Sequence, residues 1–334
     1  MKWYNIPIFV PHEGCPFDCI FCNQRKITGS DTSITKSEIS KIIKEHLATL
    51  PQCERYVEVA FFGGSFTGIS AEKQCEFLEE AYKFIESGDV DGIRLSTRPD
   101  YISEEILDRL EKYGVTSIEL GVQSMDDEVL EASNRGHTSK TVEEAVSLIR
   151  KYPFRLGLQM MTGLPADTPE KSIETAHKII ALKPDFVRIY PTLVLKDTGL
   201  CKLYTSGKYV PQELDDAVGL SSKLLKAFRK NNIDVIRISL CTTDEICENG
   251  SVVAGPFHSA FGELVESEIY YDKIVKVLCE NKGADVICVN PREVSKAVGN
   301  KKKNIIKIRE NFGIDLKIKA DARLLKGDVK IWKE

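Results

Sequence analysis

The sequence predicts an α/β fold, in which a partial (β/α)6, TIM-like barrel precedes a small α+β module. Two observations predict it. Short apolar, β-branched runs alternate six times with amphipathic stretches of helix length, which is typical of a parallel sheet with right-handed crossovers. Residues 284–334 break that pattern with a shorter strand–helix–helix–strand series. We expect the barrel over residues 1–200, an extension of it over residues 201–283, and the module over residues 284–334.

Six predicted strands share a short, apolar and β-branched composition, and they are Asn5–Val10, Tyr56–Phe62, Gly92–Ser96, Ser117–Gly121, Arg155–Met160 and Phe186–Tyr190. The helices predicted between them are Thr35–Leu50, Ala71–Glu86, Glu104–Tyr113, Lys140–Lys151 and Pro169–Leu182. Ligand sites in such folds lie on the loops after the carboxyl ends of the strands. Those loops are therefore where candidate functional residues are sought.

The loop after the first predicted strand reads HEGCPFDCIFCNQ and carries Cys15, Cys19 and Cys22. Three close thiolates suit an iron–sulfur cluster or zinc. A 4Fe–4S cluster is usually held by four cysteines, so three would leave one iron open to a substrate or cofactor. A structural zinc site takes four protein ligands, and His12 could supply the fourth. The loop predicts a metal centre.

The spacing C-x3-C-x2-C, with Phe21 before the last cysteine, resembles the signature of radical S-adenosylmethionine (SAM) enzymes. The resemblance implies a 4Fe–4S cluster on Cys15, Cys19 and Cys22, with its open iron chelated by the amino and carboxylate groups of SAM. It also implies that the cluster's electron cleaves SAM into methionine and a 5′-deoxyadenosyl radical.

The loop after the second strand, FFGGSFTG, contains paired glycines that let the backbone approach a ligand closely. An ordinary strand-to-helix turn is the alternative. The loop resembles the glycine motif that binds the SAM amino group, which places Gly63 and Gly64 at that group. Ser65 stands where many members of the family have an acidic residue.

The regions that follow the fourth and fifth predicted strands add further candidate contacts to SAM. Gln123 and Arg135 could hold its methionyl end, and Gln159 would point from the fifth barrel strand. Met161 could pack on the adenine, although core packing is the commoner role of methionine. His137 we expect to be a solvated loop residue.

Two more loop residues suggest chemistry. Arg98, beside Asp100, could hold a carboxylate or phosphate bidentately, or could form a surface ion pair with Asp100. Tyr190, at the end of the sixth strand, could serve as a hydrogen donor or proton-transfer partner. A half-buried core tyrosine with a bonded hydroxyl is the alternative.

The likeness extends over roughly residues 4–275. The segments CPFDCIFC, FFGGSFTG, STRPD, ELGVQSMDDEVL, NRGHT, MMTGLP and IYPTLVLKDTGL occur in the same order in the radical SAM core of the Elongator catalytic subunit. They resemble oxygen-independent coproporphyrinogen oxidases more loosely. About sixty residues follow the matched region, too few for the acetyltransferase domain of the Elongator subunit. We therefore do not expect acetyl-CoA use and wobble-uridine carboxymethylation to carry over directly.

The carboxyl end is basic. Residues 292–334 contain thirteen Lys plus Arg and six Asp plus Glu, a net charge of +7, against −4 for the whole chain. Its strand–helix–GNKK–helix–strand order resembles the KH fold, whose GXXG loop clamps a nucleic-acid backbone. That predicts RNA contacts at Gly299, Lys301, Lys302 and Lys303, with Lys302 replacing the second glycine. A solvated basic surface is the alternative.

Composition limits the location of the protein. No run of about 18 apolar residues predicts a transmembrane helix, and MKWYNIPIFVPHEG does not read as a signal peptide. Ten cysteines without that signal favour a reducing, cytoplasmic compartment. Outside the first loop the cysteines are scattered, although Cys241 and Cys247 could form a ligand pair.

We expect a radical SAM enzyme, a transferase that modifies RNA and most of all tRNA, supplied with electrons by a carrier such as ferredoxin or flavodoxin. Two alternatives stay open. One is the same radical chemistry on a small metabolite or a protein. The other is a non-catalytic RNA-binding protein whose cysteine loop holds zinc or a redox-sensing cluster.

Overall fold

The structure is a computed structural model that describes residues 2–10, 15, 19–23, 34–51, 53–240, 246–247 and 250–332. His12 and Cys241, two of the possible metal ligands, lie outside the described residues. The chain divides into two compact units. The barrel unit comprises Met1–Gln212 and Phe228–Phe257, and the carboxyl unit comprises Glu213–Ala227 and His258–Glu334.

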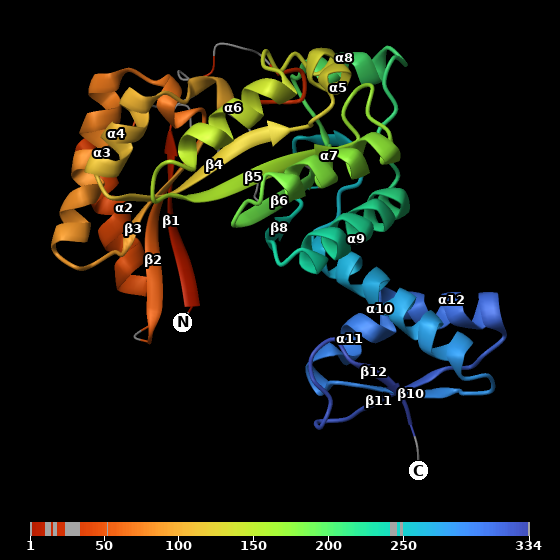
Figure 1. The fold of residues 1–334 in the computed structure, drawn as a ribbon. Helices are drawn as coiled ribbons and strands as arrows, with labels where there is room; N and C mark the ends of the chain where they lie inside the picture. Colours follow the sequence, from red (N-terminus) through yellow and green to blue (C-terminus); the bar gives the residue numbers. More distant parts are fainter. Residues whose placement is uncertain are drawn as a thin grey trace. The chain divides into compact units, whose positions relative to one another are not determined.

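A seven-stranded parallel sheet is the centre of the barrel unit, with the order β1-β2-β3-β4-β5-β6-β8 (Figure 1). Its strands are β1 Lys2–Val10, β2 Arg55–Gly63, β3 Gly92–Thr97, β4 Val115–Gln123, β5 Arg155–Thr162, β6 Phe186–Pro191 and β8 Asp234–Ile238. The edge strands β1 and β8 do not pair with each other, so the barrel is partial. The predicted fold class and all six predicted strands are confirmed, and β8 adds a seventh.

Crossover helices run along the outer face of the sheet (Figure 1). They are α2 Lys36–Thr49, α3 Ala71–Glu86, α4 Glu104–Lys112, α5 Asp127–Ala132, α6 Ser139–Ile149 and α7 Pro169–Ala181. Serine, threonine or aspartate caps each amino end by accepting a backbone N–H, as Thr35 does from Glu38 and Thr168 from Lys171. These caps explain why the five predicted helices begin within a residue of their expected starts.

Alternation along the strands divides the sheet into two chemically different faces. Buried apolar residues such as Ile93, Ile118 and Val187 pack toward the helices. Their neighbours Arg94 and Glu119 line a cavity on the other face. Since successive side chains of a strand point to opposite faces, the same strands build both the core and the site.

Smaller elements follow the sixth strand. A two-stranded antiparallel sheet joins β7 Val194–Leu195 to β9 Val252–Ala254. Helices α8 Gly199–Thr205 and α9 Leu214–Lys230 lie between them in the sequence. The sequence analysis assigned no elements to this region, because its strands are only a few residues long.

A three-stranded sheet, ordered β11-β10-β12, forms one layer of the carboxyl unit. Its elements are α10 Phe261–Glu280, β10 Val286–Val289, η4 Pro291–Glu293, α11 Val294–Val298, η5 Asn300–Lys302, α12 Lys303–Phe312, β11 Lys317–Ala320 and β12 Val329–Ile331. Strands β10 and β11 are parallel, and the predicted strand–helix–helix–strand order is present. Tyr270 and Ile274 of α10 share its core with Ile287, Ala297 and Ile308, so the unit extends upstream of residue 284. Among the described residues, no helix combines the length and the apolar character needed to cross a membrane.

Candidate active site

A cavity of about 830 Å³ lies against the inner face of the barrel sheet. It gathers every residue that the sequence analysis assigned to a cluster, to SAM or to catalysis. They are Cys15, Cys19, Cys22, Gly63, Gly64, Ser65, Gln123, Arg135, Gln159, Met161 and Tyr190. Because they come from separate loops and strand ends, their meeting in one cavity is a property of the fold and not of local sequence.

The cysteine loop borders this cavity. Cys19 is buried, Cys15 and Cys22 are half-buried, and the Cys22 N–H donates to the Cys19 carbonyl oxygen over 2.9 Å. Among the described residues, no three His, Cys, Asp or Glu side chains gather closely enough to hold a single metal ion.

Two arginines approach the Cys19 sulfur. Arg135 Nη1 donates to it over 3.3 Å, and Arg98 Nη1 lies 4.0 Å away. Arg98 also donates to the Arg135 carbonyl oxygen over 2.6 Å and pairs with the carboxylate of Asp100. Burial raises the pKa of the Cys15 thiol, while the Ser65 backbone N–H and the two guanidiniums oppose that rise.

Arg135 needs the space that Gly121 leaves. Its Nη2 donates to the Gly121 carbonyl oxygen over 2.5 Å, and a Cβ on Gly121 would lie 2.9 Å from that nitrogen. The buried Nε of Arg135 has no partner among the described residues. A bound carboxylate is the kind of acceptor that such an orphaned donor lacks.

The glycine loop is fixed to the loop after β3. The Ser65 and Thr97 hydroxyls are hydrogen-bonded over 2.7 Å, and the Arg98 N–H donates to Ser65 Oγ over 3.2 Å. Gly63 has a φ of +104°, which a residue with a side chain rarely adopts. Ser65 therefore orders the loop, a role in which its small hydroxyl suffices.

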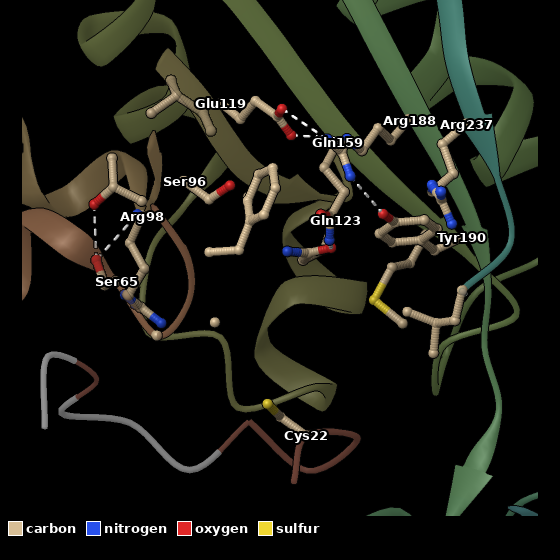
Figure 2. A pocket seen from close by; sticks show the side chains of 18 of the residues that line it. Cys22, Ser65, Ser96, Arg98, Glu119, Gln123, Gln159, Arg188, Tyr190 and Arg237 are labelled. Atoms are coloured by element: carbon tan, nitrogen blue, oxygen red, sulfur yellow. Dashed lines mark hydrogen bonds and ion pairs between the residues drawn. The ribbon is translucent and has the colours of Figure 1, made fainter. Parts of the chain in front are cut away.

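Two glutamines meet above the sheet. Gln123 ends β4 with a φ of +67°, where the register with β5 shifts between Gly121 and Gln123. Gln159 Nε2 donates to Gln123 Oε1 over 3.1 Å, and Figure 2 shows both amides directed into the cavity. Met161 is half-buried and lines the same region.

Tyr190 is half-buried and points into the cavity beside Gln159 and Arg237 (Figure 2). Arg188 Nη1 donates to its hydroxyl oxygen over 3.2 Å. Since that bond uses a lone pair of the oxygen, the Tyr190 O–H keeps its own proton for a partner in the cavity. Tyr190 can therefore be a half-buried residue with a hydrogen-bonded hydroxyl and still have a proton to donate.

The arginine that donates to Tyr190 belongs to a buried network of charged side chains. Arg188 Nε and Nη2 contact the Glu119 carboxylate at 2.8 and 2.9 Å, and Arg94 Nη1 reaches the same carboxylate at 2.9 Å. Arg94 also pairs with the fully buried Glu58 over 2.7 Å. The sequence analysis did not identify this network. The available signal was that charged residues stand among apolar ones within predicted strands, at Arg94, Glu119 and Arg188.

His137 corrects an expectation. It was expected to be a solvated loop residue, yet only 7% of its surface is exposed. Burial and the neighbouring Arg135 guanidinium lower the pKa of His137 to about 4. The imidazole is therefore neutral at pH 7 and packs as a core residue beside the arginines.

The predicted RNA contacts lie in the carboxyl unit. Lys301 and Lys302 are exposed, with φ values of +49° and +62°. Lys303 forms a short ion pair with Asp215, which engages its charge within the protein. Gly299 is buried with a φ of +82°, and a Cβ there would lie 3.0 Å from the Asn304 nitrogen. Gly299 therefore allows the chain to form the turn.

Two family models match the chain. One, described as the Radical SAM superfamily, covers residues 9–179, and the other, the Radical_SAM C-terminal domain, covers residues 184–271. Elongator complex protein 3 of Schizosaccharomyces pombe is 34% identical over 182 residues, which are 53% of this chain and 33% of that protein. A tRNA uridine(34) acetyltransferase of Methanocaldococcus jannaschii is 27% identical over 256 residues, 65% of this chain and 47% of that protein. The chain thus spans a third to a half of these curated relatives.

Solved structures share the fold. The archaeal Methanocaldococcus infernus Elp3 with an N-terminal deletion aligns with a TM-score of 0.62 at 23% identity, over 81% of this chain and 63% of that one. Streptococcus suis SuiB bound to S-adenosylmethionine aligns with a TM-score of 0.51 at 12% identity, over 78% and 54% of the two chains. At these identities the likeness concerns the fold alone.

Proposed function

Since this chain belongs to the radical SAM superfamily, we propose that it is an enzyme that cleaves SAM reductively in order to modify RNA, with tRNA as the substrate class. The cofactors of this superfamily are a 4Fe–4S cluster and SAM. When bound, the cluster supplies the electron that cleaves SAM to a 5′-deoxyadenosyl radical. The protein's residues bind and orient these groups and exclude water.

The observation that carries this proposal is the convergence of the predicted residues on one cavity. Cys15, Cys19 and Cys22 would hold three irons at its border. The unpaired Nε of Arg135 and the amide of Gln123 would bind the SAM carboxylate and amino groups beside the open iron. The backbone at Gly63 and Gly64 would contribute carbonyl oxygens to the same amino group. Gln159 and Met161 would flank the nucleoside.

Two features support RNA as the substrate. Two relatives, which match 65% and 49% of this chain, are named tRNA uridine(34) acetyltransferase. In the carboxyl unit, Lys301 and Lys302 are consecutive exposed residues with left-handed backbone in a tight turn. Their positive charges are suited to contact a phosphate backbone. The matched relatives extend well beyond the aligned region, and we propose no particular chemical group for the transfer.

Anaerobic reconstitution tests the enzyme. We expect an iron–sulfur absorbance band and formation of 5′-deoxyadenosine from SAM after reduction by dithionite or by a flavodoxin. Cys19→Ala should lose both while its circular dichroism stays unchanged. Cys279→Ala, an exposed cysteine of the carboxyl unit, is the matched control and should retain both. A colourless zinc-containing protein that leaves SAM intact would refute the proposal.

A separate experiment tests the RNA partner. The double variant Lys301→Ala/Lys302→Ala should weaken binding of bulk tRNA about tenfold at low salt, because each lost phosphate contact reduces counterion release. It should leave SAM cleavage without RNA unchanged. Lys41→Ala/Lys44→Ala removes the same charge from the exposed face of α2 and is the control. Equal tRNA affinity in the first variant and the wild type would remove the basic turn from the proposal.

A further inference from the structure

The cavity continues well past the candidate SAM residues. Met161 lines it near the carboxyl end of β5, and Arg155 lines it at the first residue of the same strand. Six residue steps along a strand span about 20 Å. Trp3, Phe186 and Asp234, which stand at or beside the first residues of β1, β6 and β8, line the same amino end. The cavity therefore reaches both ends of the sheet.

The cavity as a whole is larger than one small molecule needs. Pockets that hold one small molecule start at about 300 Å³, and the whole cavity measures about 830 Å³. The Glu119 network crosses the middle of the sheet and separates the Tyr190 region from the Arg155 region. A ligand at the amino end would be separated from the cysteine loop by that network.

Arg155 differs from the other arginines of the barrel wall. Arg94 and Arg188 are neutralised by Glu58 and Glu119. The Arg155 guanidinium carbon instead lies 4.4 Å from the centre of the Trp3 ring and 5.5 Å from that of Phe186. Among the described residues, no carboxylate lies within ion-pair distance of it, and no acceptor receives its N–H groups. A half-buried cation held by two aromatic rings is left without a counter-charge.

The cavity is lined by six arginines, namely Arg94, Arg98, Arg135, Arg155, Arg188 and Arg237, and by two carboxylates, Glu119 and Asp234. Carboxylates outside the lining reduce the excess of positive charge, since Glu58 pairs with Arg94 and Asp100 pairs with Arg98. Glu119 is occupied by Arg94 and Arg188, and Asp234 is exposed. Trp3 is 47% exposed, so an anion can reach Arg155 from solvent at this end of the cavity.

We propose that Arg155, with Trp3 and Phe186, binds the oxyanion group of a small molecule at the amino end of the barrel. The oxyanion is a carboxylate or a phosphate, because both match the fork of N–H donors that a guanidinium presents. The molecule is distinct from the RNA, and it binds at the end of the sheet opposite the cysteine loop. The proposal rests on the proposed function only in placing SAM at the carboxyl end.

Titration calorimetry of the full chain, with its cluster reconstituted and SAM in excess, tests this site. SAM occupies the Arg135 end, so the remaining anion binding reports on Arg155. Pyrophosphate and malonate are the two probes, and the tighter one identifies the phosphate or the carboxylate source. Arg155→Gln should weaken the tighter probe at least about tenfold, since a charge-assisted pair is lost. Arg155→Lys should give an intermediate loss, because a lysine keeps the charge without the fork.

Arg323→Gln is the matched control, because that exposed arginine of the carboxyl unit pairs with Asp321 and should not alter the affinity. If Arg155→Gln fails to fold by circular dichroism, Arg155→Lys decides the question. Absence of binding of both probes, or equal affinity in the wild type and the folded Arg155 variant, overturns the proposal. The titration needs no reductant and no turnover. Anion binding that depends on Arg155 without formation of 5′-deoxyadenosine would leave this site standing while the proposed function falls, and the reverse result would do the opposite.

Discussion

The Arg135 guanidinium donates a hydrogen bond to the Cys19 sulfur over 3.3 Å. Positive charge and hydrogen bonds at a ligating sulfur favour the reduced, more negative form of an iron–sulfur cluster. This contact therefore connects a candidate SAM residue to the electronic properties of the cluster. It also joins Arg98, which the sequence analysis named as a possible carboxylate or phosphate ligand, to these residues, because Arg98 donates to the Arg135 carbonyl oxygen.

Arg135→Gln should make the reduction potential of the reconstituted cluster more negative, by an amount on the order of tens of millivolts. The reason is the loss of one positive charge and one donor at the Cys19 sulfur. A redox titration followed by electron paramagnetic resonance, without SAM, measures it. Arg150→Gln, which removes an arginine paired with Asp185 on the outer surface, should leave the potential unchanged. Identical potentials in Arg135→Gln and the wild type would contradict the prediction.

Tyr190→Phe should separate SAM cleavage from product formation. The variant loses the O–H that faces the cavity but keeps the ring. We expect 5′-deoxyadenosine to form at nearly the wild-type rate with tRNA present, while modified nucleoside falls at least about tenfold, as is typical of a lost proton-transfer group. Mass spectrometry of digested tRNA and chromatography of 5′-deoxyadenosine measure the two products. A parallel loss of both would assign Tyr190 to SAM binding instead.

Gly157→Ala should destabilise the barrel unit by about 1–3 kcal/mol, the range of overpacked cores. A Cβ at this position would lie 2.1 Å from the Phe186 ring and 2.9 Å from Glu119 Cγ. Gly219→Ala is the control, because α9 has open space around Gly219 and alanine favours a helix by about 0.5–1 kcal/mol. Urea unfolding should therefore move in opposite directions for the two variants.

Lys302→Gly should stabilise the carboxyl unit. Lys302 has a left-handed backbone with a φ of +62°, which costs an L-residue roughly 1–2 kcal/mol. Glycine removes that strain but adds about 0.5–1 kcal/mol of unfolded-state entropy. The expected net gain is about 0.5–1 kcal/mol in thermal or urea unfolding. Lys276→Gly, in the exposed middle of α10, should instead cost about 1 kcal/mol. A loss of stability in Lys302→Gly would contradict this account.

His137 should contribute a pH-dependent term to stability. Its folded pKa of about 4 lies below the ordinary value of 6.5, so the unfolded chain binds the proton more readily between these pH values. Its stabilising term is fully present above pH 6.5 and is lost as the pH falls toward 4, to a total of about 3 kcal/mol. Urea unfolding of the cluster-free protein at several pH values should show that His137→Gln lacks this part of the acid sensitivity. Equal slopes against pH would contradict it.

Much of the barrel could be predicted from the sequence because its strands and helices obey local rules. The strand from Arg155 and the helix from Pro169 begin at the predicted residues, since a short apolar run and a capped proline define them within a few residues. Strand β8 was missed because DVIRI is short, and its place in the sheet comes from pairing with β6. No local pattern encodes such a long-range pairing.

The candidate site was predictable only in part, for a related reason. Cys19 became a candidate through the spacing of its motif, Gly63 through the family resemblance, and Arg135 through its place in a loop. The contacts of Arg98 with Cys19 and of Arg155 with Trp3 join residues far apart in the sequence. His137 was misjudged because a polar loop of the sequence is buried by the elements packed around it. Contacts of this kind require the three-dimensional arrangement of the strands.

Glu119 has a consequence for the kind of reaction that the barrel can support. Its Oε1 accepts from Arg94 and Arg188, and its Oε2 lies 2.8 Å from Arg188 Nε in an ion pair, so taking up a proton would disturb these contacts. Among the described residues that line the cavity, the other carboxylate is the distant Asp234, and no histidine or lysine is present. A proton that Tyr190 gives up or takes up in a product-forming step would therefore be exchanged with the substrate or with solvent, and we expect the rate of that step to respond to heavy water.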